Sequence, residues 1–268
     1  MTQLLYLIKL NTIVILSGRF HPFHKGHKSS YDLLTNEFGE DNVYIATSDV
    51  QAPVTSPFSF SDKVKMMTSL DVPSGKIVKT KNPYSASEIT DNVAEPEDTI
   101  LIFAVSEKDM VGEKPRFKFG KKKDGSPTYF QQFPDELDDC SPMTEHAYIL
   151  TIPTIEFKVL DKEVTSASEL RKMYIDNDEN SKENILVDLY GEYDPALKEI
   201  FDRKLEATKK ANDIAAISKD KEKVNNLSES QKKRLSKTLE SILLAEANAK
   251  LSLSIQGINS NKNYRSER

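Results

Sequence analysis

Strand-length apolar segments alternate with helix-length segments over most of this 268-residue chain. The strands predicted from this pattern are residues 12–16, 43–47, 76–80, 99–105, 147–152 and 156–160. The predicted helices are residues 27–38, 61–70, 85–93, 166–175, 183–190 and a last one from about residue 195. Alternation of this kind is typical of a parallel sheet covered by helices on both faces. We therefore expect a doubly wound α/β fold.

Two segments depart from this alternation. Residues 106–146 are rich in Lys, Gly, Pro and Asp, which predicts a long loop or a small β insertion. Residues 206–268 carry 13 basic and 8 acidic side chains, and an amphipathic stripe formed by Leu235, Leu239, Ile242 and Leu243. We expect one α/β domain over residues 1–205, followed by a basic helical tail that is disordered after Ile255.

Composition excludes several classes of protein. With 37 basic and 42 acidic residues the net charge is -5, which argues against nucleic acid as a partner held by bulk charge. The single cysteine, Cys140, rules out an intramolecular disulfide framework and suits a reducing compartment. No apolar run reaches about 18 residues, so no membrane partner is expected. The apolar start of the chain lacks the cleavage signal of a secreted protein, and we expect a cytoplasmic location.

Three of the four histidines lie within residues 18–27, GRFHPFHKGH, between the first predicted strand and the first predicted helix. The first backbone N–H groups of a helix lack intrahelical partners, and the helix dipole favours an anion there. Gly18 lets the backbone approach a ligand, and Gly26 keeps space between His24 and His27. Because imidazoles can donate N–H groups to phosphoryl oxygens, this loop predicts a phosphate site.

A second polar segment, residues 165–171 (TSASELR), opens a helix late in the predicted domain. Ser166 or Ser168 can cap that helix or donate a hydroxyl to a phosphate. Arg171 lies one turn further on and can donate two N–H groups to a polyphosphate. We expect this segment and the histidine loop to face the same ligand.

The His24–His27 segment resembles the H-x-G-H signature of the nucleotidyltransferase superfamily, which includes cytidylyltransferase-like proteins and has a Rossmann-like fold. Residues 18–27 are similar to the G-R-F-Q-P-F-H-x-G-H form of archaeal-type nicotinamide mononucleotide adenylyltransferases and their bacterial relatives, with His21 in place of glutamine. The insert at residues 116–129 resembles phage-encoded relatives. Residues 165–171 resemble the family's I-S-S-T-x-I-R signature, with Ala167 and Ser168 in place of Ser and Thr. The resemblance spans roughly residues 12–200.

The resemblance implies that a nucleoside monophosphate passes from a nucleoside triphosphate to a phosphorylated acceptor, with release of pyrophosphate. The form implied first is AMP transfer from ATP to nicotinamide mononucleotide, a step of NAD biosynthesis. His24 and His27 would contact the triphosphate, His27 at the reacting α-phosphate, while Arg171 would hold the departing pyrophosphate. The other implied nucleotide-binding residues are Gly18, Arg19, Phe20, Gly26, Ser166 and Ser168. The phosphates would carry Mg²⁺, so no metal site made by the protein is expected.

Two alternatives stay open at this point. Cytidylyl transfer to a phosphorylated alcohol is the first, although that branch usually has an aspartate near the position of His21. The second is a non-catalytic nucleotide-binding or assembly protein that docks through its basic tail. The sequence does not decide the acceptor, the preference for ATP over CTP, or whether the protein is a homo-oligomer.

Overall fold

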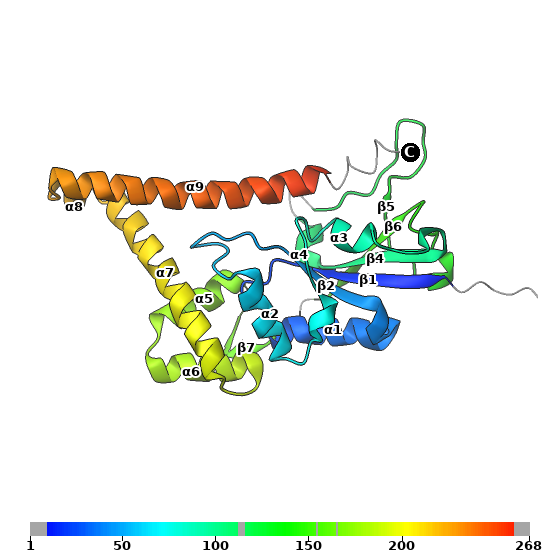
Figure 1. Ribbon diagram of the computed structural model, residues 1–268, viewed down its shortest axis with the longest axis horizontal. Coiled ribbons are helices and arrows are strands. Elements are labelled where there is room, and N and C mark those ends of the chain that lie inside the picture. The colour runs from blue at the N-terminus through cyan, green and yellow to red at the C-terminus, as the bar shows by residue number, and fades with distance from the viewer. Residues whose placement is uncertain (1–9, 112–115, 154, 165, 260–268) are drawn as a thin grey trace, which may run out of the picture.

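A six-stranded, all-parallel sheet forms the centre of the protein (Figure 1). The computed structural model describes residues 10–111, 116–153, 155–164 and 166–259. Across the sheet the strands are β3 (Ile77–Lys79), β2 (Val43–Thr47), β1 (Asn11–Ser17), β4 (Thr99–Ser106), β6 (Ala147–Ile152) and β5 (Phe130–Gln132). The chain leaves β1 toward β3 and then returns to the other side of β1 with β4. The strand order therefore reverses between β1 and β4, which confirms the doubly wound, Rossmann-like sheet.

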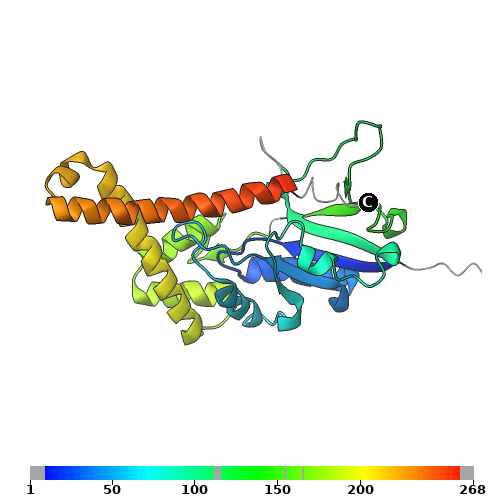
Figure 2. The same cartoon turned by 45° about the horizontal axis from the view of Figure 1, so that its top comes forward.

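Helices cover both faces of this sheet (Figures 1 and 2). They are α1 (Lys25–Phe38), α2 (Phe60–Thr68), α3 (Ser87–Thr90), α4 (Glu107–Met110), α5 (Ala167–Asp176), α6 (Glu179–Tyr190), α7 (Pro195–Lys219), α8 (Lys221–Asn225) and α9 (Glu229–Asn259). Single 3₁₀ turns occupy residues 40–42, 74–76, 96–98 and 137–139. In the described part of the chain, no helix is long and apolar enough to cross a membrane.

The middle residues of the central strands are apolar because a separate core covers each face of the sheet. Successive strand residues point to opposite faces. Val14 and Leu16 of β1 pack in one core with residues of α1, α2, α5, α6 and α7. Ile15 packs in the other core, with Phe117 and Phe130 from the insert. The insert at residues 106–146 thus supplies the edge strand β5 and part of a core, and its residues 112–115 lie outside the described residues.

Two local predictions were wrong in detail. Residues 156–160 do not add a strand to the sheet: β7 (Lys158–Val159) pairs only with β8 (Lys162–Glu163) in a small antiparallel hairpin. Helix α2 begins one residue earlier than predicted, at Phe60, because Ser59 and Asp62 form a reciprocal capping box. The first nine residues of the predicted lead-in lie outside the described residues.

The C-terminal region is helical, as predicted, and it is continuous with the α/β part. Helix α7 runs through residues 205 and 206 without a break, and Thr208 and Ala211 beyond this point are buried. Helix α9 turns back over the molecule (Figures 1 and 2) and packs against α7. Of the predicted apolar stripe, Leu243 is 58% exposed. Residues up to Asn259 are helical, and the last nine residues lie outside the described range.

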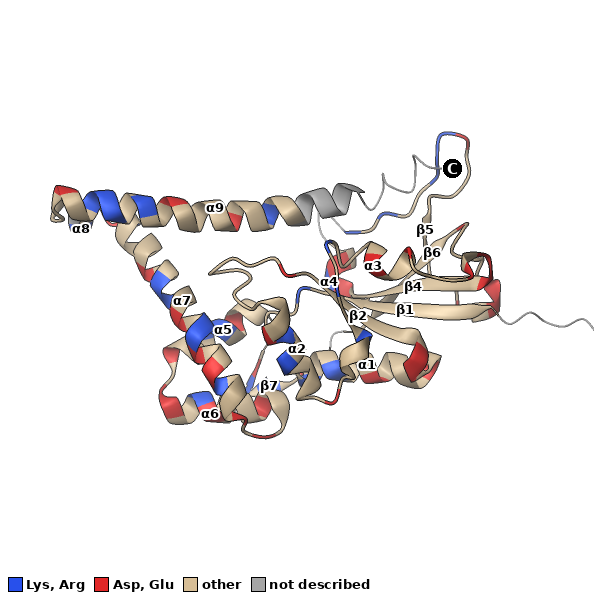
Figure 3. Ribbon diagram, in the orientation of Figure 1, with Lys and Arg blue, Asp and Glu red and all other residues tan. Residues whose placement is uncertain are grey.

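Basic side chains gather at the start of α9, at the end far from the sheet (Figure 3). They are Lys232, Lys233, Arg234 and Lys237. The other end of α9 approaches the sheet, where Ala249 is only 2% exposed. Of the 13 basic residues in residues 206–268, four are therefore clustered in this first part of α9.

Candidate functional site

The histidine loop leaves the carboxyl end of β1, beside the point where the strand order reverses. Ligands of open α/β sheets bind at this edge. His24 is the N-cap of α1: its Nδ1 accepts a hydrogen bond from the Gly26 N–H at 3.2 Å. Since Nδ1 is the acceptor, the proton of the neutral ring is on Nε2, which is therefore the donor of this imidazole.

His24 and His27 lie against one another, with their ring centroids 3.9 Å apart. Phe20 and Phe23 also pack on His27, at centroid distances of 5.0 and 5.4 Å. Burial lowers the pKa of His27 to about 4. Burial, and then the neighbouring His27 and Lys25, lower the pKa of His24. Two rings this close can both stay neutral near pH 7, and Nδ1 of His27 is buried without a hydrogen-bond partner.

The two glycines of the loop make room for aromatic rings of the protein itself. Phe20 has a positive φ of 49°, and its ring covers Gly18. A Cβ atom on Gly18 would lie 2.5 Å from Cζ of Phe20, so no larger residue fits there without moving that ring. A Cβ atom on Gly26 would lie 3.1 Å from His24 Cε1 and 3.2 Å from Phe157 Cδ1. Gly26 therefore lets the His24 ring pack over the start of α1.

Lys63, a residue that sequence reasoning missed, ties the ends of two strands together. Its side chain is fully buried, and its ammonium donates to the Arg19 carbonyl at 3.2 Å, to Thr47 Oγ1 at 2.9 Å and to the Ser48 carbonyl. Three donors thus meet three acceptors. Burial lowers the pKa of Lys63 to about 7, against the opposing effect of Asp49. No sequence signal marked Lys63, because it stands beside Met66 and Met67 on the apolar face of α2.

Arg171 joins the late motif to the histidine loop. Its guanidinium donates to the His21 carbonyl at 2.7 Å and to the Val54 carbonyl at 3.0 Å, and the residue is 8% exposed. Arg171 also lines a cavity of about 340 Å³ between α5 and α7, together with Ser168 and Val54. The two predicted motifs therefore meet at the His21 backbone, whereas His24 and His27 do not line this cavity.

The start of α5 is capped as the late motif predicts. Ser166 Oγ accepts a hydrogen bond from the Glu169 N–H at 3.2 Å and lies 3.3 Å from Ser168 Oγ. Thr165 lies outside the described residues. The two hydroxyls thus stand together at the positive end of a helix, where an anion is favoured.

Positive charge gathers around His21, the residue that replaces the glutamine of similar sequences. His21 is 5% exposed, and its Nδ1 has no hydrogen-bond partner. Burial lowers the pKa of His21, and the nearby charges of Lys63, Arg171 and Arg19 lower it further. Two guanidinium groups and the amine of Lys63 around one neutral imidazole create a local field that suits a ligand with several negative charges.

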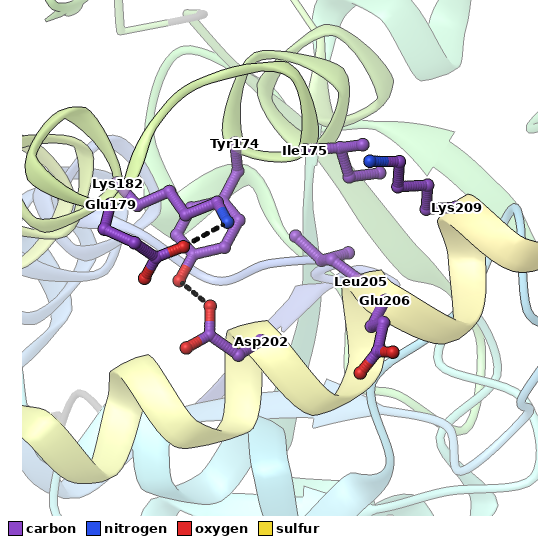
Figure 4. Close-up of a pocket in the computed structure, with 8 residues that line it drawn as sticks. All are labelled: Tyr174, Ile175, Glu179, Lys182, Asp202, Leu205, Glu206 and Lys209. Carbon is purple, nitrogen blue, oxygen red and sulfur yellow. Dashed lines mark hydrogen bonds and ion pairs between the residues drawn. The ribbon is translucent and has the colours of Figure 1, made fainter.

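Among the described residues no three His, Cys, Asp or Glu side chains gather as a metal-binding group. A second hollow of about 280 Å³ lies between α5, α6 and α7 (Figure 4). Its side chains also form no metal-binding group. Two of its carboxylates already have partners within the hollow: Glu179 accepts from Lys182 at 2.7 Å, and Asp202 accepts from the Tyr174 hydroxyl at 2.7 Å.

The comparisons with known proteins concern the part of the chain that holds the histidine loop. Residues 15–118, less than half of the chain, match the family model described as cytidylyltransferase-like. The nicotinamide-nucleotide adenylyltransferase of Methanocorpusculum labreanum is 39% identical over 51 residues, which are 19% of this chain and 30% of that protein.

A solved structure is also similar. It is a bifunctional NMN adenylyltransferase/ADP ribose pyrophosphatase from Francisella tularensis, complexed with AMP and a manganese ion. The TM-score is 0.45 and the identity 14%, over 79% of this chain and 56% of that chain. The chain thus spans less than two thirds of the length of either relative.

The buried histidines predict a dependence of stability on pH. The pKa of His27 is about 4 in the folded protein, against roughly 6.5 in an unfolded chain. Between these two pKa values the unfolded state is protonated at His27 and the folded state is not. The free energy of unfolding should therefore fall as the pH drops from 7 to 5. The loss due to His27 is at most about 1.4 kcal/mol per pH unit. Urea unfolding at pH 5, 6 and 7 measures it. A His27→Phe variant should show a smaller slope, and an equal slope would contradict the assignment.

Proposed function

We propose that the protein transfers a nucleoside monophosphate from a nucleoside triphosphate to a phosphorylated acceptor and releases pyrophosphate. The observation that carries the proposal is the pair of contacting imidazoles, His24 and His27, at the start of α1 beside the strand-order reversal. An aromatic-lined, partly buried helix start with neutral N–H donors suits a phosphate whose charge increases during reaction.

The chemistry asked of the protein is mainly positioning and charge stabilisation. The acceptor phosphate attacks the α-phosphorus, the bond from that phosphorus to the bridging oxygen breaks, and pyrophosphate leaves with the electron pair. His24 would donate from Nε2 to a phosphoryl oxygen, since its Nδ1 is held by the Gly26 N–H. His27 would stabilise the extra negative charge at the α-phosphate as the new bond forms.

The cations around His21 would hold the rest of the polyphosphate. Arg19 and Arg171 supply positive charge, and the hydroxyls of Ser166 and Ser168 lie at the start of α5. Arg171 uses two N–H groups for the His21 and Val54 carbonyls, which leaves further guanidinium donors for a ligand. Lys63 would act as a positioning residue, because its bonds join the loops after β1 and β2.

Mg²⁺ fits this site as a companion of the phosphates. The described residues include no cluster of carboxylates that could hold this ion, whereas triphosphate oxygens are good ligands for it. When bound, Mg²⁺ would neutralise part of the polyphosphate charge. The residues of the chain would contact the phosphates rather than the metal.

ATP and nicotinamide mononucleotide are the substrates we propose first. The 51-residue similarity to a nicotinamide-nucleotide adenylyltransferase favours this pair. Cytidylyl transfer to a phosphorylated alcohol is the second candidate, favoured by the cytidylyltransferase-like match of residues 15–118. A nucleotide-binding protein without turnover is the third. The charge around His21 supports nucleotide binding in all three cases.

A substrate panel separates these candidates. The protein is incubated with Mg²⁺, with ATP or CTP, and with nicotinamide mononucleotide or phosphorylated alcohols, while pyrophosphate is measured. We expect release with ATP and nicotinamide mononucleotide, and none when the acceptor is left out. Release only with CTP would select the second candidate. Nucleotide binding by calorimetry with no release in any mixture would reject the proposed activity.

A further inference from the structure

The turn after β2 presents three hydrogen-bond donors to a single anionic group. Ala52 and Ser56 pair with one another through two backbone hydrogen bonds, of 3.0 and 2.9 Å, which close a tight turn. The N–H groups of Val54 and Thr55 at its tip are not used within the turn. Both donate to Oε1 of Glu246, at 2.7 and 3.3 Å, and the Thr55 hydroxyl donates to Oε2 at 2.5 Å.

Glu246 comes from helix α9, about 190 residues away in the sequence, and it approaches the turn from outside the α/β part. In Figures 1 and 2 the helix passes over the loop that follows β2. Elsewhere α9 is loosely covered: Leu243, Leu244 and Leu251 are 58, 62 and 56% exposed. The carboxylate of Glu246 is therefore a specific polar contact on a helix that is largely open to solvent.

The donors of the turn lie beside the proposed phosphate-binding groups. Arg171 donates to the Val54 carbonyl, so its guanidinium stands next to the turn. Burial and the charge of Arg19 lower the pKa of Arg171, and the Glu246 carboxylate opposes them, so Glu246 and Arg171 are close enough to interact. Val54 and Arg171 also line the 340 Å³ cavity, together with Lys172 and Lys209. A ligand could reach the turn from this cavity.

Adjacent backbone N–H groups with a hydroxyl and a nearby guanidinium are general recognition elements for phosphate. A carboxylate can accept hydrogen bonds from the same donors with its two oxygens, whereas a phosphate group offers three or more oxygens. We propose that the Val54–Thr55 turn is a phosphate-binding cradle, and that Glu246 occupies it as an internal competitor. Helix α9 is then an autoinhibitory strap, which a phosphate group displaces. The proposal rests on the proposed function only in placing a phosphorylated substrate near the turn.

Inorganic phosphate binding to the intact protein tests this directly. Amide signals of Val54 and Thr55 are followed by NMR as phosphate is added to wild type and to a Glu246→Ala variant. Because only molecules with an open turn can bind phosphate, removal of a carboxylate that occupies the turn in about nine-tenths of the molecules should tighten phosphate binding at these amides by ~10-fold. Glu246→Gln, which keeps the side-chain shape, should show a smaller gain and serves if the alanine variant does not fold.

Controls make the result specific to the cradle. Glu240→Ala removes the same charge from an exposed position of α9, where Glu240 accepts from Ser236 at 3.3 Å, and should leave phosphate binding unchanged. Adding Thr55→Val to Glu246→Ala should lose several-fold of the gain, because one donor is removed. Equal phosphate affinity in wild type and both Glu246 variants would overturn the proposal, as would an equal gain with Glu240→Ala. Neither result depends on turnover, so a negative substrate panel is distinguishable from failure here.

Discussion

A His27→Ala variant should release pyrophosphate more than ~100-fold more slowly than the wild-type protein, because a neutral imidazole at the α-phosphate is lost. The centroid of the His27 ring lies 3.9 Å from that of His24, and the ring also packs on Phe20 and Phe23. Its position is therefore held from several sides. The comparison uses the substrate pair that is most active in the panel, at saturating concentrations. Loss in kcat rather than in KM is expected if His27 acts on the transition state.

The fourth histidine provides a matched control. His146 lies beside Tyr148, outside the histidine loop, and its Nδ1 is likewise buried without a partner. His146→Ala removes a similar ring and should keep turnover within a few-fold of wild type. Thermal unfolding of both variants shows whether they fold. A folded His27→Ala protein with near wild-type turnover would reject the proposed role of this residue.

Replacing Arg171 with methionine should both destabilise the protein and abolish turnover. The carbonyls of His21 and Val54 would lose their donors at a buried site, which costs roughly 2–4 kcal/mol of the free energy of unfolding. The loop that holds the histidines would also lose its connection to α5. Urea unfolding measures the first effect and pyrophosphate release the second.

Two further variants separate charge from geometry at this position. Arg171→Lys keeps the positive charge, but an ammonium lacks the planar fork that bridges two carbonyls, so an intermediate stability and a large loss of turnover are expected. Lys172→Met changes the exposed neighbour, which pairs with Asp176 on the surface of α5, and should alter stability by less than about 1 kcal/mol. Wild-type behaviour of Arg171→Lys in both assays would contradict the bridging role.

Most of the fold follows from the periodicity of the sequence. β2 and β6 have the predicted bounds, and β1 and β4 extend theirs by one or two residues, because strands buried on both faces are continuous apolar runs. The hairpin at residues 158–163 could not be predicted in this way. Its turn places Leu160 and Asp161 at positive φ values of 49° and 60°, without the Asn-Gly or Asp-Gly pair that marks such turns.

The site was predictable where residues act through a local pattern and unpredictable where they act across the fold. Ser166 caps α5, as predicted, and His24 lies between a strand end and a helix start, as predicted, although its role as the cap of α1 was not predicted. Lys63 and Glu246 reach the site from α2 and α9, and nothing in their neighbouring residues marks them. The domain boundary at residue 205 was predicted from a change in composition alone. Composition does not reveal that α7 continues through this residue, with Leu205 and Thr208 both buried.

The central sheet ends on both sides in a strand of three residues, β3 at one edge and β5 at the other. A second polypeptide could form few backbone hydrogen bonds with either strand, and short edges of this kind discourage chains from joining edge to edge. The parallel sheet should therefore resist growth into aggregates even at high protein concentration. Association between copies, where it occurs, would depend on helix surfaces.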